Sequence, residues 1–466
     1  MKKITLLLTL LALTVRAQTD PYAQLPAYDF GKDSAPVTAI AKEVFETKPA
    51  GYPAIEAKLL AALTKPDATY AAKKFICEQL RIVGSHKSVG ALLVLLGDDQ
   101  TAPLARFALE TLPGPAVDDG LLKALPSATG KRQIGLIYTL AARHSERLVP
   151  LLKDRLTSPD KELVAVALQA LSQVGGTKPA AILQLAKVPA DLEPLRERAW
   201  VDATFNLLKT GKAAAVVVFE EAFNKCASVP AVIGAMNGLV ECRGAAALPV
   251  VVSALKDKRE PLALAAAKTA QQLEGAAATK EFCAALPALT PPVQVALVRA
   301  LAERDDKAAL PAVKALLGAP DDALKAEAAL ALQKIGDASV VPDLIALATG
   351  EGDAAAAAQQ SLGRINADGV NAAMLKMLDD ADTRKVRVAA LTLKARADRS
   401  IMPRLLTMAA SDKNDVRGAA LDALDGFAGT SELPALLKLL DTAKDRDKEP
   451  HRGRRSSNMS LRSNSV

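Results

Sequence analysis

Residues 163–171, LVAVALQAL, decide the fold, because they are one copy of a nine-residue template that returns along the chain. The template opens on an apolar anchor, has alanine at its fifth and eighth positions and ends in leucine. Clear further copies are LKAEAALAL at 324–332 and VRGAALDAL at 416–424. Apolar residues three and four apart are typical of an amphipathic helix, and alanine lets a neighbouring helix approach closely.

The template recurs at a nearly constant interval. Successive copies are separated by 28 to 36 residues, most often by 31. The anchors fall at residues 72, 104, 132, 163, 195, 231, 262, 293, 324, 354, 386 and 416. A fixed period of this length is the signature of a repeat architecture.

Each anchor is predicted to open the second helix of a hairpin. A first helix with proline near its start should precede it, because the first helical turn tolerates a missing N–H. Acidic residues such as Asp160, Asp321 and Asp415 should cap the second helix, and glycine should end it in a left-handed conformation. The prolines are Pro53, Pro150, Pro249, Pro311, Pro342, Pro403 and Pro434, and the glycines are Gly84, Gly114, Gly175, Gly244, Gly275, Gly336 and Gly429.

A single hairpin cannot bury its own apolar faces, whereas stacked hairpins share a continuous core. The sequence therefore predicts an all-α protein, an α-solenoid of about twelve repeats over residues 51–443 that forms a right-handed superhelix. The 36-residue step predicts a kink near residues 205–230. Residues 18–50 should form an extended lead and then a capping helix at about 37–47.

The repeats resemble the HEAT repeat family, whose pattern of proline, aspartate and Val-Arg is carried best by Asp415, Val416 and Arg417. The period of about 31 residues resembles the family's short bacterial repeats, and the whole chain is similar to exported, alanine-rich HEAT proteins of environmental bacteria. Some of these precede a sugar-cleaving or cytochrome-type domain. The resemblance implies a scaffold with a protein-binding surface, and no reaction.

The first 17 residues have the pattern of a signal peptide. Lys2 and Lys3 precede a 12-residue apolar run, and Val15 and Ala17 suit cleavage after Ala17. The apolar run is shorter than the roughly 20 residues that span a bilayer. We therefore expect an exported protein, periplasmic or extracellular, without a membrane span after cleavage; a buried N-terminal helix is the alternative.

Charge is concentrated at the two ends of the chain. The total is +7, of which residues 1–17 carry +3 and residues 444–466 carry +4. The repeat array is therefore neutral. Binding to nucleic acid needs a basic face that neutralises phosphates, so we expect no nucleic-acid partner.

The residues that usually carry chemistry are few and scattered. His86, His144 and His451 have no metal-ligand spacing, and no phosphate-binding, dinucleotide or nucleophile motif occurs. We expect no catalytic residue, no metal and no cofactor. The four cysteines could form disulfides in an oxidising compartment, but buried, unpaired thiols are the better interpretation for Cys77, Cys226, Cys242 and Cys283.

The candidate binding surface lies on the second helices, which usually line the concave side of such a stack. Positions six and ten after each anchor should point outward. We expect a groove with acidic residues early, Glu78 and Glu110, and basic residues late; a solvated face of mixed charge is the alternative. The outward residues are Tyr138, Gln169, Asn237, Glu241, Lys268, Gln272, Arg299, Glu303, Lys334, Arg364 and Arg396.

The periodicity stops inside a unit. Residues 433–440, LPALLKLL, read as the first helix of a thirteenth repeat, but residues 444–466 are polar and basic. Two interpretations stay open: a natural disordered tail, or a truncation or frameshift near Asp445, which the abrupt change favours.

The sequence thus predicts a non-enzymatic, exported scaffold that mediates protein–protein interaction or assembly. The first alternative is a repeat module of a larger exported enzyme whose catalytic part is missing. The second is a lyase or glycosylase built on the repeats, against which export and the neutral array argue.

Overall fold

The computed structural model describes residues 20–446, with side chains as far as Leu440, and this span is helical throughout, without a β-strand. The expected signal peptide lies outside the described residues. So does all of the expected tail beyond Arg446.

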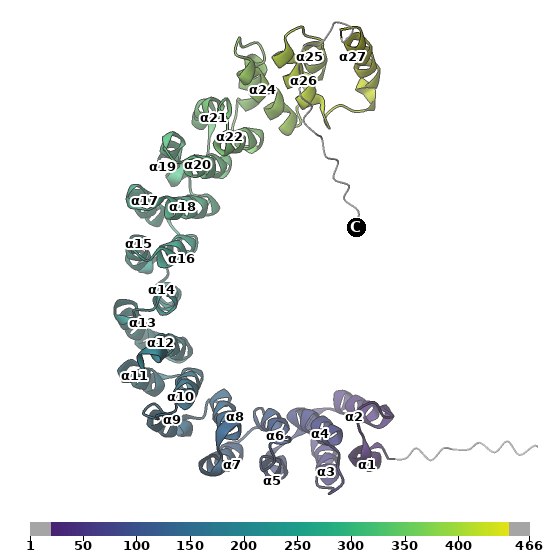
Figure 1. Cartoon of the computed structure of the whole chain (residues 1–466), viewed down its shortest axis with the longest axis vertical. Helices are drawn as coiled ribbons and strands as arrows, with labels where there is room; N and C mark the ends of the chain where they lie inside the picture. The colour runs from purple at the N-terminus through teal and green to yellow at the C-terminus, as the bar shows by residue number, and fades with distance from the viewer. Residues whose placement is uncertain (1–19, 447–466) are drawn as a thin grey trace, which may run out of the picture. The chain divides into compact units, whose positions relative to one another are not determined.

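Twelve helical hairpins follow one another between Tyr52 and Leu424 (Figure 1). The first helices are α3 (Tyr52–Leu63), α5 (His86–Leu95), α7 (Pro115–Ala124), α9 (Val149–Arg155), α11 (Thr177–Leu185), α13 (Lys212–Lys225), α15 (Leu248–Leu255), α17 (Ala276–Ala285), α19 (Leu310–Ala315), α21 (Val341–Ala348), α23 (Val370–Met377) and α25 (Met402–Ala409). The second helices are α4 (Tyr70–Val83), α6 (Ala102–Leu109), α8 (Gly130–Ala142), α10 (Lys161–Val174), α12 (Glu193–Leu208), α14 (Val229–Arg243), α16 (Glu260–Ala270), α18 (Pro291–Glu303), α20 (Asp322–Ile335), α22 (Asp353–Arg364), α24 (Thr383–Ala395) and α26 (Asn414–Leu424).

The predicted repeats are confirmed helix by helix. Every second helix begins one to three residues before its anchor, and the expected prolines occupy the first turns of first helices, as Pro150 does in α9 and Pro311 in α19. Asp160 and Asp321 cap α10 and α20 by accepting backbone N–H bonds. Asp415, predicted to cap α26, lies instead in its first turn, and the N-cap residue is Lys413. Local signals therefore determine where each helix begins.

Alanine and leucine build the core of the stack. In α10, Ala167, Leu168 and Leu171 are fully buried, and the same positions are buried in most other second helices. Most successive second helices pack against each other more extensively than successive first helices do. Within each unit the second helices are thus the more tightly packed row, as expected on the concave side of a curved stack.

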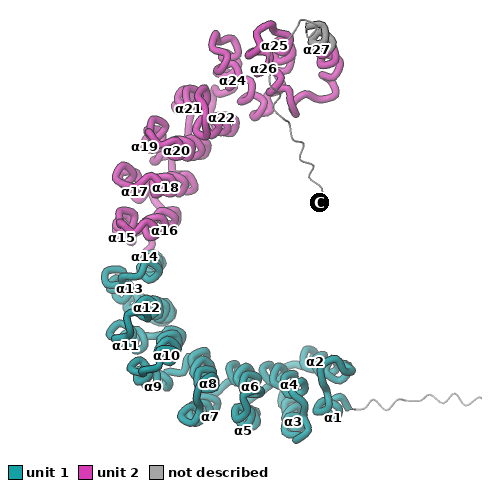
Figure 2. Tube along the Cα trace, viewed as in Figure 1, with its two compact units in different colours: residues 1–242 teal, residues 243–466 magenta. Residues whose placement is uncertain are grey.

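The chain divides into two compact units, residues 1–242 and residues 243–466 (Figure 2). The boundary falls at the last residue of α14. The predicted kink lay earlier, at 205–230. There the 36-residue step is taken up by longer helices, since α12 has 16 residues and α13 has 14.

The lead before the repeats is not extended, so that prediction was wrong. Asp20 accepts a bond from the Tyr22 N–H, and Pro21 fills the first turn of the short helix α1 (Pro21–Gln24). A 3-10 turn, Leu25–Ala27, follows, and then the capping helix α2 (Ala35–Glu46) close to its predicted position. Aspartate followed by proline starts a helix because it supplies the cap and tolerates the missing donor.

Two glycines after second helices are needed for space and not for a left-handed backbone. Gly84 has φ −72° and Gly336 has φ −72°, contrary to the prediction. A Cβ on Gly84 would lie 2.4 Å from the Leu80 carbonyl oxygen, and one on Gly336 would lie 2.3 Å from that of Leu332. The chain turns so tightly there that no side chain fits.

One apolar stretch, Val229–Leu255, is long and apolar enough to span a membrane by length and composition. It is divided between α14, a 3-10 turn that begins at Gly244 with φ 56°, and α15. Almost half of its most apolar window is buried inside the protein. Core helices of repeat proteins have the same composition, so the stretch is weak support for a membrane span.

The first helix of a thirteenth repeat is present as predicted. It is α27 (Leu433–Arg446), which extends three residues into the segment expected to be disordered. Leu433, Leu437 and Leu440 are each about half exposed on it.

Candidate interaction surface

The second-helix face, made of the eleven outward residues predicted above, is largely solvent-exposed. Nine of the eleven are exposed, and Tyr138 and Arg396 are partly buried. In unit 1 the face comprises Tyr138 on α8, Gln169 on α10, and Asn237 and Glu241 on α14; the other residues belong to unit 2. The placement leaves the nine exposed side chains accessible to a partner.

Neighbouring repeats of unit 1 are joined across this face by Tyr138 and Gln169. The Tyr138 hydroxyl donates a hydrogen bond to Gln169 Oε1. Burial, and then the nearby Glu162 carboxylate, raise the pKa of Tyr138, so the hydroxyl keeps its proton and remains a donor.

Ion pairs make the same kind of connection in unit 2. Arg299 on α18 binds Glu327 on α20 through Nε (3.0 Å) and Nη2 (2.5 Å). Lys334 on α20 binds Glu303 on α18 at 2.7 Å. The Lys334–Glu303 pair is exposed and stabilises the stack little, whereas the Glu327 side chain is only 12% exposed. Both pairs neutralise charges that were expected to be available to a partner.

Two cations of the face are left over. Lys268 on α16 and Arg364 on α22 are exposed, and within the described residues neither has a hydrogen-bond or ion-pair partner. The early end of the face is not a simple acidic end, since Glu78 pairs with Lys74 at 3.1 Å. In the described part of unit 2, the charged side chains of the face that remain unpaired, Lys268 and Arg364, are both positive.

Arg396 points into the protein instead of lying on the open face. Its Nη1 donates to the carbonyl oxygens of Leu362 (3.4 Å) and Ile365 (2.8 Å), and its Nε donates to Asn371 Oδ1. The carbonyls belong to the end of the preceding repeat. Arg396 thus ties two repeats together.

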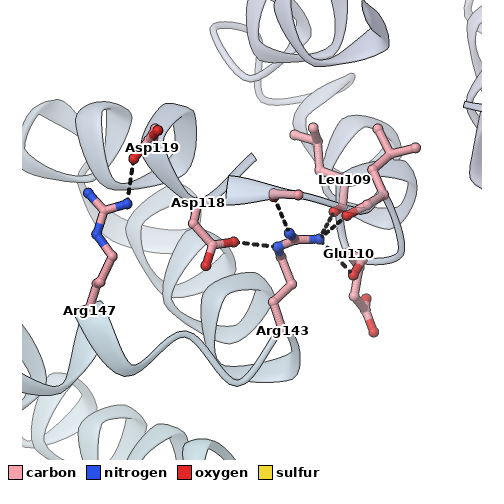
Figure 3. A network of polar contacts seen from close by, with 8 residues as sticks. Leu109, Glu110, Asp118, Asp119, Arg143 and Arg147 are labelled. Atoms are coloured by element: carbon pink, nitrogen blue, oxygen red, sulfur yellow. Dashed lines mark hydrogen bonds and ion pairs between the residues drawn. The ribbon is translucent and has the colours of Figure 1, made fainter. Parts of the chain in front are cut away.

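Arg143 and Arg304 do the same at two other junctions, and we call the three residues the arginine clamps. Arg143 Nη1 donates to the carbonyl oxygens of Leu109 (2.9 Å) and Leu112 (2.5 Å), and its Nε donates to Asp118 Oδ1 at 2.6 Å (Figure 3). The unsatisfied carbonyls at a helix end are good acceptors for a guanidinium.

Arg304 repeats the arrangement in unit 2. Its Nη1 binds the Ala270 carbonyl at 3.0 Å, and its Nη2 binds the Gly275 carbonyl and Thr279 Oγ1, both at 3.0 Å. Burial lowers the pKa of Arg304, although the side chain stays charged. A recurrent arginine ten or eleven residues after anchors 132, 293 and 386 was the sequence signal for the clamps.

Each clamp precedes a residue in the left-handed conformation. His144, Asp305 and Ala397 have φ of 53°, 51° and 55°, although none is glycine. Such a residue ends the helix and lets the chain turn back toward the next first helix. Glycine is the residue predicted for such helix ends, so these three left-handed positions were not predicted from the sequence.

Two buried carboxylates also join successive repeats. Glu56, 2% exposed, accepts the Ser85 N–H (2.7 Å) and the Ser88 hydroxyl (2.5 Å) at the start of α5. Burial opposes ionisation of Glu56, but the hydrogen bonds from Ser88 and Ser85 outweigh it and lower its pKa. Glu197 on α12 caps α14 in the same way through Ala227 and Ser228.

The candidate chemical groups are dispersed. All four cysteines are free, as expected, and burial raises the pKa of Cys77 and Cys226 to about 12, which keeps both thiols protonated. His86 lies in the first turn of α5, and His144 Nδ1 lies 3.4 Å from the Val174 carbonyl oxygen. Within the described residues, no three His, Cys, Asp or Glu side chains gather as metal ligands would.

The repeats themselves identify the family. Residues 279–363, which run from α17 to α22, match the model for HEAT repeats. The chain contains HEAT repeats. The hairpins outside this HEAT match follow the same order of helices and anchors, and several of them, such as those that begin with α3, α9, α15 and α25, also have proline in the first turn.

No curated protein matches the chain. Among solved structures it is similar to a chain of the structure of Kap95p with RanGDP (12% identity, TM-score 0.45) over 91% of its length, and covers 63% of that chain. It matches a chain of the structure of Kap121p bound to Ste12p (14%, TM-score 0.45) over 93% of its length and 55% of that chain. Human deoxyhypusine hydroxylase with glycerol (21%, TM-score 0.26) is matched over 54% of this chain and 96% of that one. All three identities are below 25% and all three TM-scores are below 0.5, so no property of these proteins is assigned to this chain.

Proposed function

We propose that this HEAT-repeat protein is an exported, non-enzymatic scaffold that binds a protein partner along its second-helix face. The observation that carries the proposal is the set of exposed side chains at the outward positions of α10, α14, α16, α18, α20 and α22. A stack of helical hairpins offers an extended surface of this kind, and the architecture is typical of protein-interaction scaffolds.

Unit 2 provides the residues on which to test the proposal. Arg299 and Lys334 are held in ion pairs, whereas Lys268 and Arg364 are unpaired among the described residues and remain available for a partner's carboxylates. Charged groups at the edge of an interface act mainly on encounter rate and specificity. A partner that meets this part of the face should therefore be acidic.

Photo-crosslinking tests the binding face directly. A photoreactive residue at Lys268 or Arg364 should capture one protein in living cells, and capture should be saturable. Lys280 on α17 and Lys376 on α23 are matched controls, because both are exposed and lie on first helices of the same unit. Equal capture from all four positions would overturn the proposal.

Export rests on the sequence of residues 1–17. A fusion of residues 1–25 to alkaline phosphatase, which is active only outside the cytoplasm, should be active in a bacterial host. A variant with Leu7→Arg and Leu11→Arg interrupts the apolar run and should be inactive. An inactive wild-type fusion would exclude a periplasmic or extracellular protein.

A further inference from the structure

Exposed aromatic rings are confined to one part of the described chain. Phe30, Phe45, Tyr70 and Phe107 are exposed, while every other described Phe, Tyr or Trp is partly or fully buried. Three of the four belong to one surface on unit 1. A single exposed ring is common, but exposed rings grouped on one surface indicate an interaction site.

We call this the aromatic–cation surface, made of Phe30, Tyr70, Lys74, Arg81 and Phe107. The Phe30 and Tyr70 rings are 6.4 Å apart, and Lys74 Nζ lies 5.8 Å from the centre of the Phe30 ring. The Arg81 guanidinium carbon lies 4.2 Å from the centre of the Phe107 ring. Each cation is thereby held over a ring, a contact that orients it before a partner arrives.

The surface follows one face of α4. Tyr70, Lys74 and Arg81 are separated by four and seven residues, a spacing that places them on the same side of a helix. Tyr70 and Arg81 are eleven residues apart, which is about 16 Å at 1.5 Å per residue. A partner helix of three turns, or an extended segment of about five residues, spans this distance.

The surface has an excess of positive charge. It contains two cations, Lys74 and Arg81, and the carboxylate of Glu78 lies beside Lys74 on the same helix. Glu78 pairs with Lys74, whereas Arg81 has no carboxylate partner among the described residues. A guanidinium already oriented on a ring and lacking a counter-ion is well placed to receive a carboxylate.

We propose that the aromatic–cation surface binds an acidic segment of a protein partner. A carboxylate of the partner pairs with Arg81, and apolar side chains of the partner pack on Phe107 and on Ile82, which is 56% exposed. Aromatic residues and arginine are the residue types that dominate the energy of protein interfaces. The inference rests on the proposed scaffold function but concerns unit 1, so it is tested apart from the crosslinking positions in unit 2.

Fluorescence anisotropy with the full chain tests this surface. The probe is a fluorescein-labelled peptide of about twelve residues that alternates pairs of glutamate with leucine and phenylalanine. Two further probes are the same peptide with lysine for glutamate, and a single-stranded oligothymidine of similar charge. The acidic peptide should bind, the lysine peptide should not, and the oligothymidine should bind much more weakly.

The variants identify the residues responsible. Arg81→Glu should lower the affinity for the acidic peptide about tenfold or more and allow the lysine peptide to bind. Phe107→Ala should lower the affinity for the acidic peptide about fivefold. Lys178→Glu and Leu185→Ala are matched controls on the exposed surface of α11 and should change nothing. Circular dichroism confirms that each variant is folded.

Three results would overturn the inference: no binding of the acidic peptide, equal weakening by Arg81→Glu and Lys178→Glu, or equal affinity for oligothymidine, which would indicate a general polyanion surface. Crosslinking from Lys268 and Arg364 is unaffected by any of these results. Failure of this inference therefore remains distinguishable from failure of the proposed scaffold function.

Discussion

Replacing Arg143 with alanine should loosen the junction between the second and third hairpins. The Arg143 side chain is only 10% exposed and that of Asp118 only 18%. The substitution removes one charge-assisted bond to Asp118 and the donors to the Leu109, Leu112 and Gly114 carbonyl oxygens (Figure 3). The Leu109 and Leu112 carbonyl oxygens are partly buried, whereas that of Gly114 is exposed.

The magnitude follows from what is left unpaired. Removing one partner of a buried ion pair costs about 3–5 kcal/mol, and hydrogen bonds to charged groups contribute about 1.5–3 kcal/mol each. Water can reach some of the freed carbonyls, so we expect about 3 kcal/mol in the free energy of opening at this junction. That corresponds to a change of roughly a hundredfold in the opening equilibrium.

Amide hydrogen exchange read by mass spectrometry measures this change locally, without assuming that the whole stack unfolds in one step. Exchange from the end of α6 through α8 should accelerate by roughly a hundredfold, while exchange in α10 and beyond should change little. Arg143→Lys should behave almost like alanine, because an ammonium cannot reproduce the fork of donors.

Arg147→Ala is the matched control. Arg147 pairs with Asp119 near the same junction, but the two side chains are 58% and 60% exposed (Figure 3). An exposed pair contributes about 0–1 kcal/mol. Equal exchange rates in the Arg143 and Arg147 variants would refute the clamp as a stabilising contact.

Three further predictions concern single positions. Because folding lowers the pKa of Glu56, the stabilisation by its carboxylate is complete above about pH 4.3 and is lost as the pH falls through the folded pKa. Glu56→Gln should therefore lower Tm at pH 7, and the Tm of this variant should fall less toward pH 3 than that of the wild type. Gly84→Ala should lower the free energy of unfolding by more than about 1 kcal/mol, because the new Cβ clashes with a carbonyl oxygen. Gly90→Ala should raise it by about 0.5–1 kcal/mol, because Gly90 lies in α5 with open space around it. Chemical denaturation measures both changes. Ala397→Gly should stabilise by about 1 kcal/mol in the same assay, since its φ is 55°, and an unchanged midpoint would contradict a strained backbone there.

The repeats could be predicted because their signals are local. The spacing of alanine and leucine within nine residues, a proline in the first turn and an aspartate before the second helix each act within one or two turns. All twelve second helices consequently begin where the anchors require. The outward positions were derived from helix periodicity alone, and the Lys268 and Arg364 side chains are exposed.

The arginine clamps could not be predicted in the same way. Arg396 occupies an outward position by periodicity, yet carbonyl oxygens at the end of the preceding repeat turn its side chain inward. That outcome depends on three helices whose ends meet only in the folded stack. The stack of Arg81 on Phe107 likewise joins helices of different repeats, and the sequence gives no register between them.

Reversing the charge of the two unpaired cations tests the central claim most directly. The double variant Lys268→Glu, Arg364→Glu is compared with the double variant Lys280→Glu, Lys376→Glu. The two variants have the same net charge, but the second changes residues on the first helices. The quantity measured is the amount of the crosslinked partner that co-purifies with each chain. Binding along the second helices predicts a loss of about tenfold or more for the first pair and none for the second. Equal retention, or equal loss, in the two variants would contradict it.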